Sequence, residues 1–171
     1  FGSVILLVVI VYIDIFKKIL ISDSEYWVAL SIVPIILLAN LCLGIYHNLS
    51  VWYKVTDRTR FGAYISIVGA LLTLGLNFTL IPLMSYMGSA IATLAAYGTM
   101  MVLSYFFGRK YYPVPYDLKK IGGYLVLSVT FSAIAFYGFD GNLIIGTALL
   151  LVFLLLVFLL EKKDLKRIMN R

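Results

Sequence analysis

The chain has 171 residues, 63% of them hydrophobic and 13% charged, and its mean hydropathy is +1.02. This composition excludes an ordinary soluble domain, because too little charge remains to keep its surface in water. On so apolar a chain, the net charge of +6 indicates membrane topology and attraction to anionic headgroups rather than nucleic-acid binding. With one His and one Cys, no residue pattern suggests a metal site, and no cofactor is expected.

The predicted fold is an all-α, polytopic integral membrane helix bundle. Apolar runs of about 18 or more residues can cross a hydrocarbon core of roughly 30 Å as helices. A barrel would show short alternating segments, which the uninterrupted apolar run at 146–160 does not. Hydropathy predicts one transmembrane lobe over residues 1–160 and a basic cytoplasmic tail at 161–171. Its six helices are expected at about 1–16, 27–50, 60–82, 86–108, 119–138 and 142–160.

The first predicted helix begins at Phe1 without an initiator Met, and no basic region precedes its apolar run, so it does not resemble a signal peptide. We therefore expect the chain to be the C-terminal part of a larger protein. Asp14 is the only carboxylate within a predicted span, and Lys17 and Lys18 follow one turn later. This spacing favours an ion pair at the membrane surface over an ion-coupling site.

Polar residues interrupt the second and third helices at membrane depth. Asn40, Gly44, His47 and Asn48 lie along one face of the second helix, and Asn77 lies deep in the third. For Asn40 and Asn77 we favour a hydrogen bond between helices over a place in the wall of a translocation cavity. His47 is expected near the cytoplasmic end, where packing at an interface is favoured over proton sensing.

Small residues recur at helical spacing in the third and fourth helices, which predicts that these two helices pack closely as a hairpin. Pro82 is expected to end the third helix where the chain turns. The opposite face of the third helix carries Ile65, Leu71, Leu72 and Leu76. The small stripes are Gly62, Ser66, Gly69, Ala70, Thr73 and Asn77 in the third helix, and Gly88, Ala92, Ala95, Ala96 and Thr99 in the fourth.

The sixth helix has large apolar residues all round from 149 to 160, which predicts a peripheral span that faces lipid. Alternate loops carry very different numbers of Lys and Arg, so the basic loops and the C-terminus are assigned to the cytoplasm. Trp52 and Tyr53 are interpreted as belt residues at the cytoplasmic surface rather than as sugar-stacking platforms. The predicted cytoplasmic set is Lys54, Arg58, Arg60, Arg109, Lys110, Lys119, Lys120, Lys162, Lys163, Lys166, Arg167 and Arg171, and the outer set is Lys17 and Lys18.

Several short motifs occur in a characteristic order between residues 26 and 120. They are "LSVWYK" at 49–54, "LNFTLIP" at 76–82, a Gly-Ser-Ala-Ile-Ala-Thr helix start at 88–93 and "KYYPVPY" at 110–116. In this order they resemble the C-terminal half of bacterial polysaccharide flippases. These are the O-antigen type within the MATE-like multidrug/oligosaccharidyl-lipid/polysaccharide exporter superfamily.

The resemblance implies one lobe of a transporter with two six-helix lobes around a central cavity. Such proteins move undecaprenyl-diphosphate-linked oligosaccharide from the inner to the outer leaflet during lipopolysaccharide and other surface polysaccharide biosynthesis, which fits alternating access. The implied location is the bacterial inner (plasma) membrane, multi-pass, with a cytoplasmic C-terminus. The implied partners are the lipid-linked oligosaccharide, membrane lipids, a missing N-terminal lobe of the same protein and a polysaccharide polymerase.

The resemblance also suggests site residues. Lys54, Arg58 and Arg60 would attract the anionic diphosphate at the cytoplasmic mouth, although their role as topology determinants explains them equally well. Asn40, His47 and Asn77 are further substrate-binding candidates, and Asp14 is a candidate for ion coupling.

Three other functions stay open. An ion-coupled multidrug or metabolite exporter of the same superfamily would need buried carboxylates, and only Asp14 lies in a span. A membrane enzyme of cell-envelope polysaccharide assembly would need loops with catalytic acids or His, and the outer loops are too short for these. A purely structural subunit fits the polar faces less well. The sequence therefore favours a transporter, not an enzyme.

Overall fold

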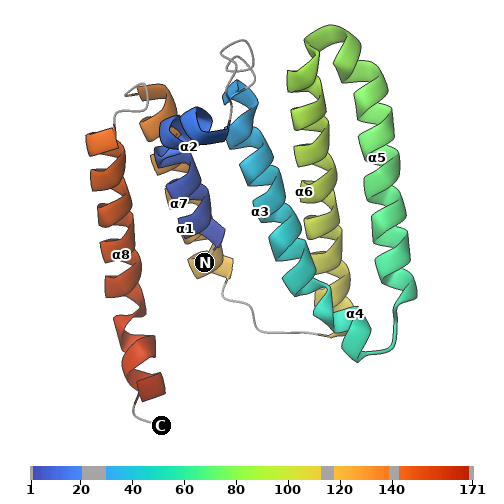
Figure 1. The fold of residues 1–171 in the computed structure, drawn as a ribbon. Coiled ribbons are helices and arrows are strands. Elements are labelled where there is room, and N and C mark those ends of the chain that lie inside the picture. The colour runs from blue at the N-terminus through green and yellow to red at the C-terminus, as the bar shows by residue number, and fades with distance from the viewer. Residues whose placement is uncertain (1, 21–29, 113–117, 139–142, 170–171) are drawn as a thin grey trace. The chain divides into compact units, whose positions relative to one another are not determined.

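The computed structural model describes residues 2–20, 30–112, 118–138 and 143–169, and every regular element in these ranges is helical (Figure 1). The predicted all-α class is therefore confirmed for the described part of the chain. The elements are α1 (Gly2–Val11), α2 (Ile13–Leu20), α3 (Val33–Leu49), α4 (Val51–Val55), α5 (Arg60–Met84), α6 (Tyr86–Tyr111), α7 (Leu118–Ala133), a π-helical turn η2 (Ile134–Gly138) and α8 (Leu143–Met169).

The helices form two compact units. The central unit contains α3, α4, α5 and α6, and the terminal unit contains α1, α2, α7, η2 and α8. The single lobe over residues 1–160 stays a prediction.

Within the described ranges, four helical stretches are long and apolar enough to cross a membrane: Leu30–Val55, Arg60–Met84, Tyr86–Tyr111 and Leu143–Leu160. By length and composition, the chain is that of a membrane protein. The apolar helices Gly2–Val11 and Lys120–Phe136 are shorter. They fall where the first and fifth spans were predicted, so a total of six spans also stays a prediction.

The first predicted helix, 1–16, is divided in two. α1 ends at Val11 and α2 begins at Ile13, with Tyr12 between them. The backbone N–H of Phe16 donates to the carbonyl oxygen of Tyr12 at 3.0 Å, so a new helical turn starts at Tyr12. Hydropathy alone could not locate this break, because the residues on both sides of it are apolar.

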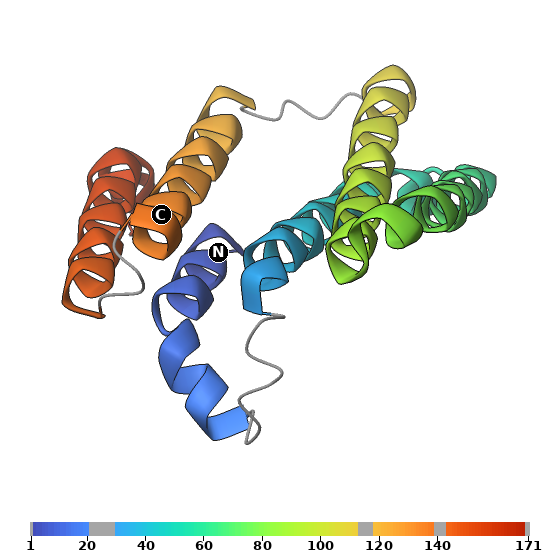
Figure 2. The same cartoon turned by 90° about the horizontal axis from the view of Figure 1, so that it is seen from above.

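In the central unit, α6 packs against both α3 and α5 (Figures 1 and 2). Its buried side shows a spacing of four residues, which follows one ridge of a helix. The small-residue stripe predicted on this helix is confirmed at Gly88, Ala92 and Ala96. The buried row is Gly88, Ala92, Ala96, Met100, Ser104 and Gly108.

Two glycines bring α5 and α6 close together. A Cβ added to Gly88 would collide with the backbone carbonyl of Leu80, and one added to Gly69 would collide with the side chain of Met100. Since lipid is as apolar as these helices, van der Waals contact at such short range is what holds them together. The predicted hairpin is confirmed.

The face of α5 that packs differs from the predicted one. Ile65, assigned to the opposite face, is only 1% exposed and lies in a core cluster with Tyr46 and Met100. Ser66 and Ala70, assigned to the packed stripe, are exposed. The buried face is centred on Gly62, Ile65 and Gly69, so shape complementarity, rather than small size alone, decides which residues are covered.

Pro82 does not end α5, as had been expected; it lies inside a helix that runs to Met84. Proline lacks a backbone N–H, so α5 continues past Pro82 without the bond from this residue to the carbonyl four residues earlier. The chain reverses at Ser85, the single residue between α5 and α6, which has φ 51° and ψ −129°. Its N–H donates to the carbonyl of Ile81 at 2.8 Å.

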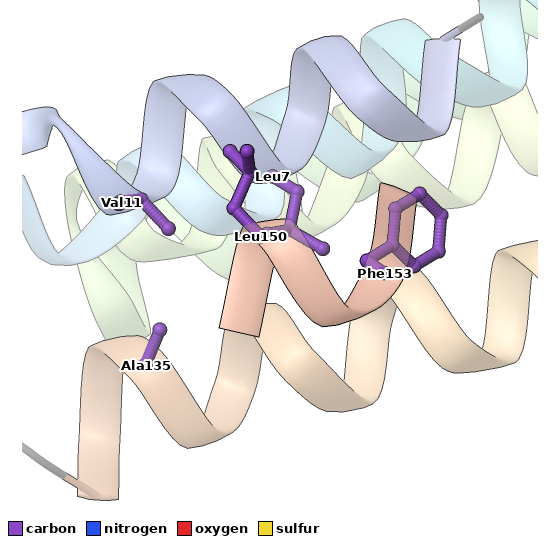
Figure 3. Packing of buried hydrophobic residues seen from close by; sticks show 5 residues of the cluster. All are labelled: Leu7, Val11, Ala135, Leu150 and Phe153. Atoms are coloured by element: carbon purple, nitrogen blue, oxygen red, sulfur yellow. The ribbon is translucent and has the colours of Figure 1, made fainter. Parts of the chain in front are cut away.

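The terminal unit has a core of larger side chains from α1, η2 and α8 (Figure 3). Val11 of α1 lies against Gly146 of α8, where an added Cβ would be 2.9 Å from Cγ1 of Val11. Because Phe153 and Leu150 are buried here, α8 is not exposed all round, although Leu151, Leu155 and Leu159 are exposed as predicted. The core residues are Leu7, Val11, Ala135, Leu150 and Phe153.

Candidate functional site

Cationic side chains gather at one end of the central unit, where α4 ends, α5 begins and α6 ends (Figure 1). All of them are exposed, and Asp57 is the only carboxylate between residues 30 and 112. We call this surface the basic end. Its residues are Lys54, Arg58, Arg60, Arg109 and Lys110. The structure thus places the predicted Lys54, Arg58 and Arg60 at the same end, and it adds Arg109 and Lys110.

Aromatic rings from three helices pack beneath the basic end. Trp52 stacks on Tyr111 with ring centroids 5.9 Å apart and planes at 18°. The ring centroid of Phe61 lies 5.0 Å from that of Tyr111 and 5.4 Å from that of Phe107. Offset and tilted ring pairs at these distances are favourable beyond the area they bury. We call Trp52, Tyr53, Phe61, Phe107 and Tyr111 the aromatic cluster.

The interpretation of Trp52 and Tyr53 as belt residues is wrong. Their exposed fractions are 4% and 8%, so neither ring meets the headgroup region. The indole Nε1–H of Trp52 donates to the carbonyl of Ser104 at 3.2 Å, and the hydroxyls of Tyr46 and Tyr53 lie 3.3 Å apart. Both residues therefore connect α4 to the rest of the unit, and neither ring is free to stack on a sugar.

Two glycines make room for these rings. A Cβ on Gly108 would lie 2.9 Å from Cδ1 of Trp52, and a Cβ on Gly62 would lie 2.8 Å from Cε2 of Tyr53. Any larger residue at either position would push a ring aside. Gly62 and Gly108 are thus the residues in the sequence that indicate the aromatic cluster. Their role can be recognised only when it is known which helices pack together.

A backbone turn at Asp57 positions Arg58 so that its side chain reaches Tyr111 of the aromatic cluster. Asp57 has φ 55°, and the N–H of Arg58 donates to the carbonyl of Tyr53 at 2.8 Å, a bond typical of a Schellman C-cap. The guanidinium carbon of Arg58 lies 4.5 Å from the ring centroid of Tyr111, and Nζ of Lys110 lies 5.5 Å from it. These distances are those of cation–π contacts. Arg58 is therefore the most firmly held cation of the predicted trio.

The polar face predicted on the second helix is uncovered. Asn40, Gly44, His47 and Asn48 are all exposed on α3 and its membrane-length stretch Leu30–Val55. The side-chain amide of Asn48 donates to the carbonyl of Gly44 at 3.2 Å. A face with amide and imidazole groups at membrane depth needs water or another polypeptide beside it.

Asn77 lies on α5 and is half-buried. Its carbonyl oxygen Oδ1 is shielded from solvent and has no hydrogen-bond partner among the described residues. The interhelical hydrogen bond favoured from the sequence is therefore not formed by this oxygen. Asn77 lies far along α5 from the basic end, so the structure does not bring it together with Lys54, Arg58 and Arg60.

Asp14 belongs to α2 in the terminal unit. Its carboxylate pairs with the ammonium group of Lys17, which confirms the ion pair expected from the spacing. Both side chains are partly buried, but a pair that water still reaches contributes little to stability. Among the described residues, His, Cys, Asp and Glu side chains do not gather in a group that could hold a metal ion.

The chain matches no protein-family model, no curated protein and no solved structure. The resemblance to polysaccharide flippases therefore stays a prediction. The polar face of α3 and the basic end are the features of the central unit that bear on function.

Proposed function

We propose that this chain is one lobe of a transporter that moves undecaprenyl-diphosphate-linked oligosaccharide from the inner to the outer leaflet of the bacterial inner membrane. The observation that carries the proposal is the uncovered polar face of α3, formed by Asn40, Gly44, His47 and Asn48. Amide and imidazole groups are costly in hydrocarbon, so a membrane-length helix with such a face is expected to line a water-filled path.

The charge of the basic end supports an anionic substrate. Its cations lie at the end of the unit where α3 passes into α4, and a concentrated positive surface raises the local concentration of anionic ligands. Arg58 is held over Tyr111, so less side-chain freedom is lost when its guanidinium binds a phosphate. Lys54, Arg58 and Arg60 form the mouth in this proposal, with the C-terminus on the same, cytoplasmic side.

The packing of the central unit supports alternating access, in which rigid bundles rock around a site near the middle of the membrane. The contact of Gly88 with the backbone of Leu80 and the insertion of Trp52 beside Gly108 tie α4, α5 and α6 together. A unit tied at both ends of its helices moves as one body.

The test uses the full-length protein reconstituted in vesicles with a fluorescent undecaprenyl-diphosphate oligosaccharide, whose movement between leaflets is followed. The proposal predicts protein-dependent movement that is slowed several-fold by Asn40→Leu and by joint replacement of Lys54, Arg58 and Arg60 with Gln. The matched comparison is Arg109→Gln with Lys110→Gln, which removes charge from the basic end outside the proposed mouth and should slow movement less.

If the lipid moves and none of these variants slows it, the proposed transport activity stands. The basic residues are then determinants of membrane topology only. No movement of the lipid, together with export of small cationic dyes from the same vesicles, would contradict the proposed substrate and favour a multidrug exporter. In that case Asp14 would be the first residue to test for ion coupling.

A further inference from the structure

The short helix α2 has two chemically distinct sides. Asp14, Lys17 and Lys18 project from one side of a helical wheel, while Ile15, Phe16 and Ile19 project from the other. The apolar side is not packed against the protein: these three side chains are exposed, Ile19 by 72%. Ile13, at the edge of the apolar side, is buried and holds the start of α2 against the terminal unit.

The contacts of α1 with α8 determine where α2 begins relative to the membrane-length stretch of α8. Val11 lies beside Gly146, and the hydroxyl of Tyr12 lies 3.5 Å from Oγ1 of Thr147. Leu7 and Leu150 share the core nearer the middle of α8, so the two helices run in opposite directions. α1 therefore ends about one turn from Leu143, where the membrane-length stretch Leu143–Leu160 begins.

A straight continuation of α1 would leave the membrane at this point. The eight residues from Tyr12 to Ile19 would rise about 10 Å along the helix axis, beyond the end of the α8 span. Ile19 would then lie in water, and Ile15 and Phe16 would lie at the level where the α8 span begins. Instead the helix breaks at Tyr12 and α2 leaves the axis of α1 (Figures 1 and 2).

We propose that α2 is an interfacial helix that docks its Ile15, Phe16 and Ile19 side into the lipid bilayer at the boundary between headgroups and acyl chains. A short helix with an exposed apolar side and lysines on its other side fits this boundary, since the apolar side enters the acyl region and the lysines meet phosphates. Pairing with Asp14 leaves Lys17 compatible with that position. The inference does not depend on which substrate the protein moves.

The test measures the depth of spin labels in the full-length protein reconstituted in phospholipid vesicles. Single cysteines replace Ile15, Ile19 or Lys18 in a background in which the native Cys42 is replaced by Ala. Collisions with oxygen, which concentrates in lipid, are compared with collisions with a water-soluble nickel chelate. Leu155→Cys, at an exposed position within the α8 span, is the reference for a deep site.

Labels at Ile15 and Ile19 are expected at the same shallow depth, about 5–10 Å into the boundary, with an oxygen-to-nickel ratio several-fold above that at Lys18 and below that at Leu155. Equal nickel access at all three α2 positions would overturn the proposal by placing α2 in water. Exclusion of both reagents at Ile15 and Ile19 would also overturn it, because another polypeptide would then cover this face.

Discussion

The two units of the molecule solve the same packing problem with different side chains. The central unit brings helix backbones together at Gly88, packs the side chain of Met100 against Gly69, and fills one end with large rings that fit beside Gly62 and Gly108. The terminal unit relies on side chains such as Leu7, Leu150 and Phe153 (Figure 3). Backbone-close contact leaves no room for adjustment, whereas aliphatic chains can shift, so the central unit is expected to tolerate substitution less well.

The largest effect is expected from removing the central ring of the aromatic cluster. Trp52→Ala deletes a ring that stacks on Tyr111 and hydrogen-bonds to the carbonyl of Ser104, which lowers the free energy of unfolding by about 3–5 kcal/mol. The measurement is an SDS titration in mixed micelles followed by circular dichroism. Phe78→Ala, at a side chain that is 81% exposed, is the control and should change little. Equal losses for the two variants would contradict the burial of Trp52.

A smaller effect separates the two kinds of glycine contact. Gly88→Ala puts a methyl group against the backbone carbonyl of Leu80, which cannot move aside, and should destabilise by about 1–3 kcal/mol in the same titration. Gly69→Ala meets only the side chain of Met100, which is unbranched and can shift, and should cost clearly less.

Gly98 supplies the matched control for this comparison. It lies in the same helix as Gly88, and a Cβ there meets nothing within 4 Å. Gly98→Ala should be neutral or stabilising, because Ala favours a helix over Gly. If Gly88→Ala and Gly98→Ala behave alike, the close approach of α5 and α6 is incorrect.

The turn of the central hairpin offers a stabilising change. Ser85 has φ 51° and ψ −129°, a conformation that is strained for any residue with a Cβ. Ser85→Gly should therefore raise the free energy of unfolding by about 1 kcal/mol. Ser89→Gly, the same substitution inside α6, should lower it by a similar amount. A loss at both positions would show that Ser85 is not strained.

The smallest effect concerns the basic end. Arg58→Gln removes a cation 4.5 Å from the ring centroid of Tyr111 and should cost about 0.5 kcal/mol. Arg60→Gln should not destabilise, because this cation begins α5, where the helix dipole disfavours positive charge. Thermal denaturation of both variants, in detergent at low salt, measures this difference in stability. If Arg60→Gln destabilises the protein more than Arg58→Gln, the contact of Arg58 with Tyr111 is not stabilising.

Sequence reasoning placed the helices well, because charged or polar connections separate the apolar runs. The predicted starts at residues 60 and 86 coincide with those of α5 and α6. The break at Tyr12 was missed because Val11 and Ile13 on either side of it are both apolar, and the first charged residue, Asp14, follows only two positions later. Pro82 was taken as a stop because proline disfavours helix interiors, but α5 continues to Met84.

The site was predicted less completely, since it depends on pairing between distant residues. Trp52 suits a membrane belt and a protein interior equally well, and only its contact with Gly108 decides between them. Arg109 and Lys110 join Arg58 because the end of α6 lies beside α4, which the sequence alone does not show. For Asn40 the sequence favoured a hydrogen bond between helices, whereas the side chain is exposed, because α3 packs on α6 with another face.

The central claim, that α3 lines a water-filled path, is tested most directly by thiol labelling. Single cysteines are introduced at Asn40 and Gly44 of α3, and at Leu71 and Leu74, which are exposed on the apolar side of α5. All four variants are made in the full-length protein with Cys42→Ala and reconstituted in vesicles. A membrane-impermeant thiol reagent should label the α3 positions and spare those on α5. Equal protection at all four positions would place the polar face of α3 outside water and contradict the account.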